Sequence, residues 1–121
     1  MNTNSVTPIF RIFDEHKAKQ FYLEYLDFSL DWEHRYGNDF PLYMQISNHL
    51  LTLHLTEHYG DCSPGSAIRI LVSDLEDFHR TLVSKNYKYS RPEIETTEWG
   101  TQEVCVIDPF GNKLTFVEEQ H

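Results

Sequence analysis

The chain has 121 residues, enough for one domain, and its 40% apolar and 24% charged residues are typical of a globular protein. Its formal net charge of −9 argues against nucleic acid as a partner, because an acidic surface repels phosphates. No apolar run is long enough to span a membrane and nothing at the N-terminus resembles a signal peptide, so we expect a cytoplasmic protein without a membrane partner. Cys62 and Cys105 lie far apart without CxxC spacing, which favours two free thiols.

The first half of the chain predicts the order strand, helix, strand, strand, strand. Residues 7–13 read as a strand, and Asp14 after them is a suitable helix N-cap. Apolar residues then recur at helical spacing and indicate one buried helix face, formed by Ala18, Phe21, Tyr22, Tyr25 and Leu26. Three further strands are predicted over residues 28–36, 42–47 and 50–56.

The second half repeats this order after a linker at residues 57–65, which is rich in turn-forming residues. Residues 66–72 read as a strand. Ser73 and Glu76 have the spacing of a capping box that would open a second helix, and Asn86 is a plausible left-handed stop for it. Residues 87–95 are interpreted as a less regular strand that Pro92 interrupts.

The chain ends in a hairpin. Apolar runs at residues 104–107 and 114–117 read as its two strands, and Asp108-Pro109-Phe110-Gly111-Asn112 reads as the turn between them. Pro109 fixes φ early in the turn, and either Gly111 or Asn112 can take the positive φ that closes it.

This hairpin, with its Asp-Pro-x-Gly-Asn turn and the preceding Glu98-Trp99-Gly100, resembles the terminal hairpin of the glyoxalase, bleomycin-resistance and extradiol-dioxygenase superfamily (the vicinal oxygen chelate fold). The likeness is greatest to the bleomycin-resistance branch. The repeated order of elements supports it, as does the recurrence of Phe10-Arg11-Ile12 as Ile68-Arg69-Ile70. The resemblance implies an α+β fold in which one domain, residues 1–121, contains two βαβββ modules at about 6–57 and 66–119. These modules would form a cupped mixed sheet with helices on its outer face.

Strand parity predicts which side chains face the cup. Side chains alternate across a strand, so the more apolar set of each strand is expected to pack under its helix. Arg11 and Arg69 then face the cup from matching positions, and His54 and Thr115 face it from the fourth strand of each module.

A metal site was tested against the same pattern. The resemblance implies that metal-dependent relatives place one His or Glu on the first and fourth strands of both modules, and the aligned positions here are Thr7, His54, Ala67 and Thr115. Alanine offers no ligand, threonine hydroxyls are poor ligands, and one imidazole does not hold a catalytic ion. We therefore predict no metal, no cofactor and no catalytic residue.

Aromatic residues, 14% of the chain, suggest another use for the cup. Six of them lie on predicted strands or loops that could rim it, although packing is the alternative explanation for each: Trp32, Tyr36, Phe40, Tyr43, Tyr59 and Trp99. The resemblance implies that bleomycin-resistance proteins sequester their drug without changing it, and that Trp99 lies near the pocket. The acidic surface would suit such a basic drug.

Three functional hypotheses follow. The leading one is metal-independent binding of an aromatic or cationic small molecule such as bleomycin, by a homodimer like that of the relatives. The main alternative is a lyase, isomerase or dioxygenase of the same fold with an unrecognised metal site around His54, and the third is a fold that only mediates association. The predicted ligand-binding residues are Arg11, Trp32, Phe40, His54, Tyr59, Arg69, Trp99 and Thr115.

Overall fold

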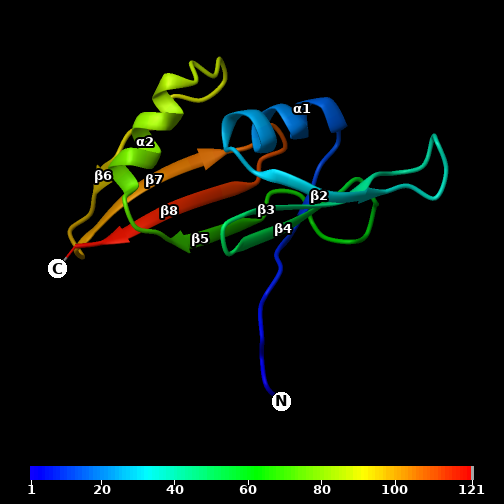
Figure 1. The fold of residues 1–121 in the computed structure, drawn as a ribbon, viewed down its shortest axis with the longest axis horizontal. Helices are drawn as coiled ribbons and strands as arrows, with labels where there is room; N and C mark the ends of the chain where they lie inside the picture. Colours follow the sequence, from blue (N-terminus) through cyan, green and yellow to red (C-terminus); the bar gives the residue numbers. More distant parts are fainter. Residues whose placement is uncertain (121) are drawn as a thin grey trace.

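The computed structural model of the protein describes residues 1–120 and contains the predicted strand–helix–strand–strand–strand order twice (Figure 1). In the first module a five-residue α-helix continues directly into a π-helical segment. The elements of the first module are β1 (Ile9–Arg11), α1 (Glu15–Lys19), η1 (Gln20–Tyr25), β2 (Ser29–His34), β3 (Tyr43–Asn48) and β4 (Leu51–Thr56). Those of the second module are β5 (Ala67–Leu71), α2 (Leu75–Ser84), β6 (Glu95–Thr96), β7 (Thr101–Ile107) and β8 (Lys113–Glu119).

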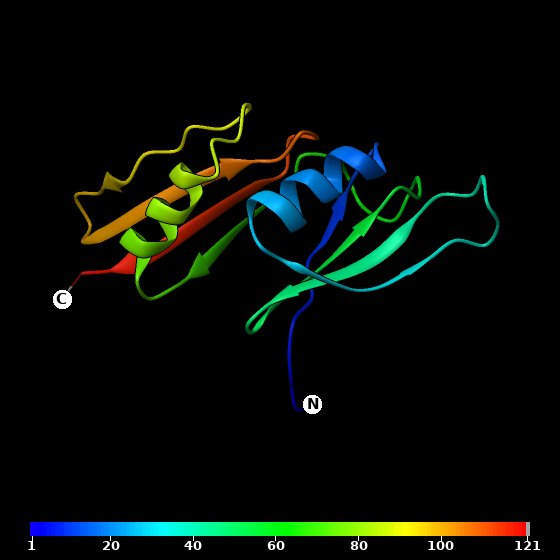
Figure 2. The same ribbon diagram turned by 45° about the horizontal axis from the view of Figure 1, so that its top comes forward.

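Each module forms its own four-stranded mixed sheet. The strand orders are β1-β4-β3-β2 and β5-β8-β7-β6, so the two sheets have the same topology. In each sheet the first and last strands of the module pair in parallel, while the remaining neighbours are antiparallel. Both helices lie on the same side of the two sheets (Figure 2). The predicted α+β fold of two βαβββ modules is confirmed.

The hydrophobic core lies between the sheets and their helices. Alternate residues of β3 and β4 point into it, as the period of two requires. In the first helix the five predicted apolar residues are all buried. One continuous cluster joins the two modules, with Phe10, Ile12, Met44, Ile46, Leu53 and Leu55 from the first and Leu75, Leu82, Val104, Val106, Leu114 and Phe116 from the second.

The first helix begins as predicted and then changes character. The Asp14 carboxylate accepts a hydrogen bond from the Lys17 N–H at 2.9 Å, which confirms Asp14 as the N-cap. At the other end the Leu26 N–H donates to the Phe21 carbonyl at 3.0 Å, a bond of π-helical spacing. No helix in the described part of the chain is long and apolar enough to cross a membrane.

The second helix is capped differently from the prediction. Its N-cap is Asp74, at a φ of 58°, and no capping side chain of its own bonds there, so the predicted box opened by Ser73 does not form. Instead Glu118, distant in sequence, accepts hydrogen bonds from the N–H groups of Asp74 and Leu75 at 3.1 and 3.2 Å. The left-handed conformation of Asn86, at a φ of 51°, is confirmed.

The predicted strand at residues 87–95 is wrong. Only Glu95–Thr96 pairs with β7, and the preceding residues are irregular. Pro92 has no N–H for a strand ladder, and the segment instead packs its tyrosines against the first helix.

The terminal turn joins the two modules. Gly111 takes the positive φ, 89°, and Asp108 and Asn112 are buried. The Tyr22 hydroxyl of the first helix donates to Asp108 Oδ2 at 2.7 Å, and Asn112 Nδ2 donates to the Arg11 carbonyl at 2.8 Å. The turn motif therefore has a structural role, because its polar side chains bind both the helix and the first strand of the other module.

Candidate functional site

An aromatic surface covers the inner face of the first sheet, opposite its helix. Trp32 and Tyr43 lie with their rings nearly parallel, 9° apart, and their centroids 6.0 Å apart. The His54 ring stands edge-on to both, with its centroid 5.4 Å from that of Trp32 and 5.2 Å from that of Tyr43. We call these three residues the aromatic platform. Trp32 remains 43% exposed, so a flat molecule has access to its ring.

A β-bulge places Trp32 on this face. The register of β2 against β3 shifts between Leu30, which pairs with Ile46, and Trp32, which pairs with Gln45. Without the shift Trp32 would share the face of Leu30, because residues two apart in a strand point the same way. The extra residue, Asp31, accepts hydrogen bonds from Gln45 Nε2 at 3.0 Å and from the Ser47 hydroxyl at 3.0 Å.

Both ring nitrogens of His54 form hydrogen bonds to neighbouring side chains. Nε2 lies 3.0 Å from Gln45 Oε1 and Nδ1 lies 2.7 Å from the Tyr43 hydroxyl. Because Gln45 directs its amide nitrogen to Asp31, its oxygen faces His54 and accepts a hydrogen bond from Nε2–H, so the Tyr43 hydroxyl donates to Nδ1. Burial lowers the pKa of His54, which favours this neutral tautomer.

The residues at the four positions aligned with metal ligands do not suit a metal ion in this chain. Neutral His54 has no free lone pair, since Tyr43 bonds the only unprotonated nitrogen. The alignment of Thr7 with the first strand is also corrected: Thr7 precedes β1, and Ile9 is the register partner of His54. In the second sheet Ala67 pairs with Lys113 and Arg69 pairs with Thr115. The described residues include no group of three or more His, Cys, Asp or Glu side chains placed to hold an ion.

Arg11 lies at the edge of the same face. Its guanidinium is 4.7 Å from the Phe13 ring centroid and 5.9 Å from that of Tyr59, and Nη2 donates to the Glu57 carbonyl at 3.2 Å. Its Nε is buried and finds no acceptor among the described residues. Tyr59 itself is 94% exposed in the linker between the modules.

The inner face of the second sheet carries an anchored carboxylate. Arg69 Nη2 is 2.7 Å from Glu103 Oε2, and the Thr101 hydroxyl donates to the same oxygen at 2.9 Å. The hydrogen bond from Arg69 is the main cause that lowers the pKa of Glu103, with smaller contributions from Thr101 and Trp99. Glu103 is therefore held ionised on a face where Thr115 lies beside Arg69 in the neighbouring strand.

Seven of the eight predicted ligand-binding residues thus fall into two groups on two sheets. On the first, Trp32 contacts His54, and Tyr59 lies near Arg11. On the second, Arg69 bonds Glu103, Trp99 contributes to the lowered pKa of Glu103, and Thr115 adjoins Arg69. Phe40 joins neither group, because it lies in the loop after β2, which extends beyond the body of the molecule (Figure 1).

Sequence reasoning missed two residues of these faces, Gln45 and Glu103, and it named Tyr43 as a residue that could rim the cup without including it among the ligand-binding residues. Strand parity could have found Gln45, which alternates with the buried Met44 and Ile46. Glu103 looked like one acidic surface residue among many, and only the register that brings it opposite Arg69 distinguishes it.

Comparisons with known proteins agree with the fold. The whole chain, residues 1–121, matches the family model described as glyoxalase superfamily protein. A bleomycin-binding protein solved with bleomycin superposes with a TM-score of 0.72 at 24% identity, covering 98% of this chain and 100% of that one. None of the curated proteins matches the sequence.

Two further solved structures have the same fold. A bleomycin resistance determinant encoded on the transposon Tn5 gives a TM-score of 0.73 at 21% identity, covering 98% of this chain and 100% of that one. An antibiotic-binding protein from Streptomyces sp. CB03234 gives 0.70 at 20% identity, covering 99% and 100%. Because the family model spans every residue, the chain belongs to the glyoxalase superfamily.

Proposed function

We propose that this protein binds an aromatic or cationic small molecule on the inner faces of its sheets without changing it chemically, with bleomycin as the first candidate. The observation that carries the proposal is the aromatic platform. Trp32 and Tyr43 present nearly parallel rings on an open face, and His54 beneath them is locked in one neutral tautomer. Such a surface is suited to stacking on a flat ring.

Charge supports the cationic part of the proposal. The chain carries a net charge of −9, and Glu103 is held ionised by Arg69 and Thr101 on the second inner face. Trp99 contributes to the lowered pKa of the same carboxylate, so an aromatic ring and an anion lie near each other there. Cationic aromatic ligands have complementary groups for both.

A homodimer is part of the proposal, because the two groups of residues lie on separate sheets. A second copy that placed its second inner face over the first would bring Trp99 and Glu103 to the aromatic platform. Leu71, 71% exposed beside Arg69, gives that face an apolar surface to cover. We place this function in the cytoplasm, as expected from the sequence.

The test uses the two tryptophans as separate reporters. In the Trp99→Phe variant Trp32 is the only indole, so its fluorescence reports on the first inner face. In the Trp32→Phe variant Trp99 is the only indole and reports on the second, so each variant is titrated with bleomycin. We expect both to change fluorescence. Trp32→Ala should weaken binding measured by calorimetry by about 2- to 10-fold, the value of one aromatic contact. No heat and no spectral change at high micromolar drug would reject bleomycin as the ligand.

The enzymatic alternative is separated from binding by metal content. Since the neutral His54 has both nitrogens engaged, we expect no stoichiometric Zn, Ni, Mn or Fe after purification without an affinity tag. Elemental analysis of the wild-type protein and of His54→Ala is the measurement. Near-equimolar metal that disappears in His54→Ala would favour the lyase, isomerase or dioxygenase hypothesis.

A further inference from the structure

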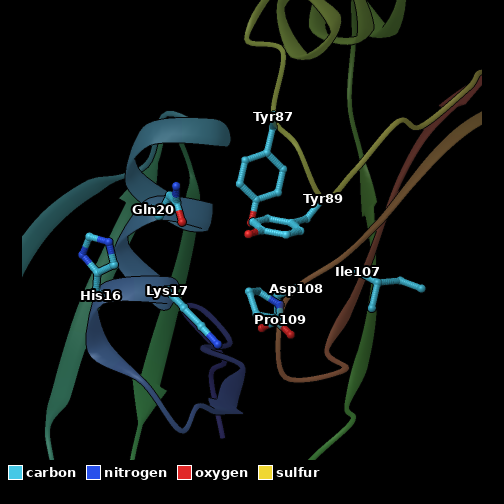
Figure 3. Close-up of a pocket in the computed structure, with 8 residues that line it drawn as sticks. All are labelled: His16, Lys17, Gln20, Tyr87, Tyr89, Ile107, Asp108 and Pro109. Carbon is cyan, nitrogen blue, oxygen red and sulfur yellow. The ribbon is translucent and has the colours of Figure 1, made fainter.

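A cavity lies on the helix side of the molecule, away from the aromatic platform and from Glu103. It has a volume of about 470 Å³ and opens between the first helix and the irregular segment that follows α2 (Figure 3). Cavities that hold small organic ligands typically have this volume. Its walls are formed by His16, Lys17, Gln20, Tyr87, Tyr89, Ile107, Asp108 and Pro109. We call it the outer groove.

The aromatic wall of the outer groove is held rigidly. Tyr87 stacks on Tyr25 of the first helix, with centroids 4.4 Å apart and planes 22° apart. Lys85, two residues before Tyr87, bonds Asp27 Oδ1 at 2.5 Å and so ties the segment to the first module. Tyr89 stands at 74° to Tyr87, with centroids 5.7 Å apart, and its ring is 69% exposed. The two rings form a corner against which a planar molecule fits.

The floor of the outer groove presents no unsatisfied acceptor. Asp108 is its only acidic residue, and both carboxylate oxygens are already bonded. Oδ1 accepts from the N–H groups of Phe110 and Asn112, and Oδ2 accepts from the Tyr22 hydroxyl and the Asn112 amide. A ligand donor therefore has no partner at this carboxylate, and four donors already offset its charge.

The opposite wall carries a lysine that forms no ion pair among the described residues. Lys17 and Gln20 line the groove from the first helix, across from the two tyrosines, and the Lys17 side chain extends toward the turn at Asp108 and Pro109 (Figure 3). Lys17 forms no ion pair among the described residues, although the chain has 19 acidic residues, and Lys88 Nζ lies 5.4 Å from the ring centroid of Tyr89. Two ammonium groups, those of Lys17 and the adjacent Lys88, therefore lie at this groove, while its one carboxylate, Asp108, already accepts four hydrogen bonds. An anion is therefore the complementary ligand here, in contrast to the inner faces.

We propose that the outer groove binds a planar aromatic carboxylate. The ring would lie against Tyr87 and Tyr89, and the carboxylate would accept hydrogen bonds from the Lys17 ammonium and the Gln20 amide. This site is independent of the proposed binding on the inner faces, since it shares no residue with the aromatic platform or with Glu103.

Naphthalene-2-carboxylate is the probe, titrated into the ¹⁵N-labelled full chain and followed by two-dimensional NMR. We expect shifted amides to cluster at residues 16–20, 87–89 and 107–108. Lys17→Glu should weaken binding by roughly tenfold or more, the value of a lost hydrogen bond to a charged group. Tyr89→Ala should weaken it as well, and naphthalene-2-carboxamide, which lacks the charge, should bind less tightly to wild type.

The matched control is Arg80→Glu, which makes the same charge change at an exposed residue of α2 outside the outer groove and should leave affinity unchanged. Lys17 and Tyr89 are both exposed, so both variants should fold. The proposal is overturned if no amide shifts at millimolar probe, if the shifts cluster on the inner faces, or if both variants bind as wild type does.

Discussion

At the scale of single residues, the inner faces pair aromatic rings with fixed polar groups. His54 receives a hydrogen bond from Tyr43 and donates one to Gln45, so its tautomer is set by neighbours rather than by a ligand. Glu103 is fixed in the same way by Arg69 and Thr101. Because these partners already satisfy the polar groups, a ligand would gain affinity here chiefly through ring stacking and through charge.

Glu103 gives a prediction on pH. The Arg69 hydrogen bond lowers its pKa below the usual value of 4.5, so its interactions stabilise the folded state above that value and are lost as the pH falls through the lowered pKa. We expect Glu103→Gln to unfold at lower urea than wild type at neutral pH. The difference should close as the pH is lowered from about 5 to about 3, measured by urea denaturation.

The matched control for this prediction is Glu93→Gln, a change at an exposed glutamate that should leave the urea midpoint near that of wild type throughout. A gap between Glu103→Gln and wild type that widens toward acid would show the opposite sign of coupling and would contradict the assignment.

At the scale of elements, the terminal turn is the joint between the modules. Tyr22 reaches Asp108 from the first helix, and Asn112 reaches the carbonyl of Arg11 in the first strand. The side chains of Asp108 and Asn112 are both buried, so water does not replace the hydrogen bonds that they form. The Asp-Pro-x-Gly-Asn pattern therefore supports the relative placement of the two sheets as well as the hairpin.

Removal of the Tyr22 hydroxyl tests this joint. We expect Tyr22→Phe to lower the free energy of unfolding by about 1–3 kcal/mol, because Asp108 loses a buried donor. Urea denaturation followed by circular dichroism measures it. Tyr36→Phe, on an exposed tyrosine, is the control and should unfold with wild type. Equal midpoints for all three proteins would show that the bond contributes nothing to the joint.

The elements also show which features a local pattern can predict. Apolar alternation located most strands and the buried helix face, because both depend on neighbouring residues alone. The cap of α2 could not be found that way, since Glu118 is 43 residues from Leu75. The bulge at Asp31 was equally hidden: Trp32 was predicted at the cup only as one of several aromatic residues, and the shift in register is what places it on the inner face. The irregular path of residues 87–94 depends on their packing against Tyr25.

At the scale of the whole molecule, the chain leaves both inner faces open. Every residue of β2 is exposed, and β5 exposes alternate residues, including Leu71. Seven of the eight predicted ligand-binding residues are divided between these faces and Phe40 lies on neither, so a single chain does not assemble them. A two-fold pair in which each first face meets the partner's second face would make two equivalent pockets and cover the exposed apolar side chains.

The last prediction concerns this assembly. We expect sedimentation equilibrium at micromolar concentration to give twice the 14.4 kDa chain mass. A stable dimer buries about 800 Å² of each partner, which the inner faces must supply from a total surface of 7,915 Å². Leu71→Asp places a charge on the second inner face and should dissociate the dimer, while Val83→Asp, on an exposed apolar residue of α2, should not.

A wild-type protein that sediments only at the chain mass contradicts the dimer. If Leu71→Asp remains dimeric, the subunits associate through another surface, and the tryptophan titrations then show which inner face holds the ligand in each chain. If Leu71→Asp is instead monomeric and loses bleomycin binding, the two faces act as one site across the interface.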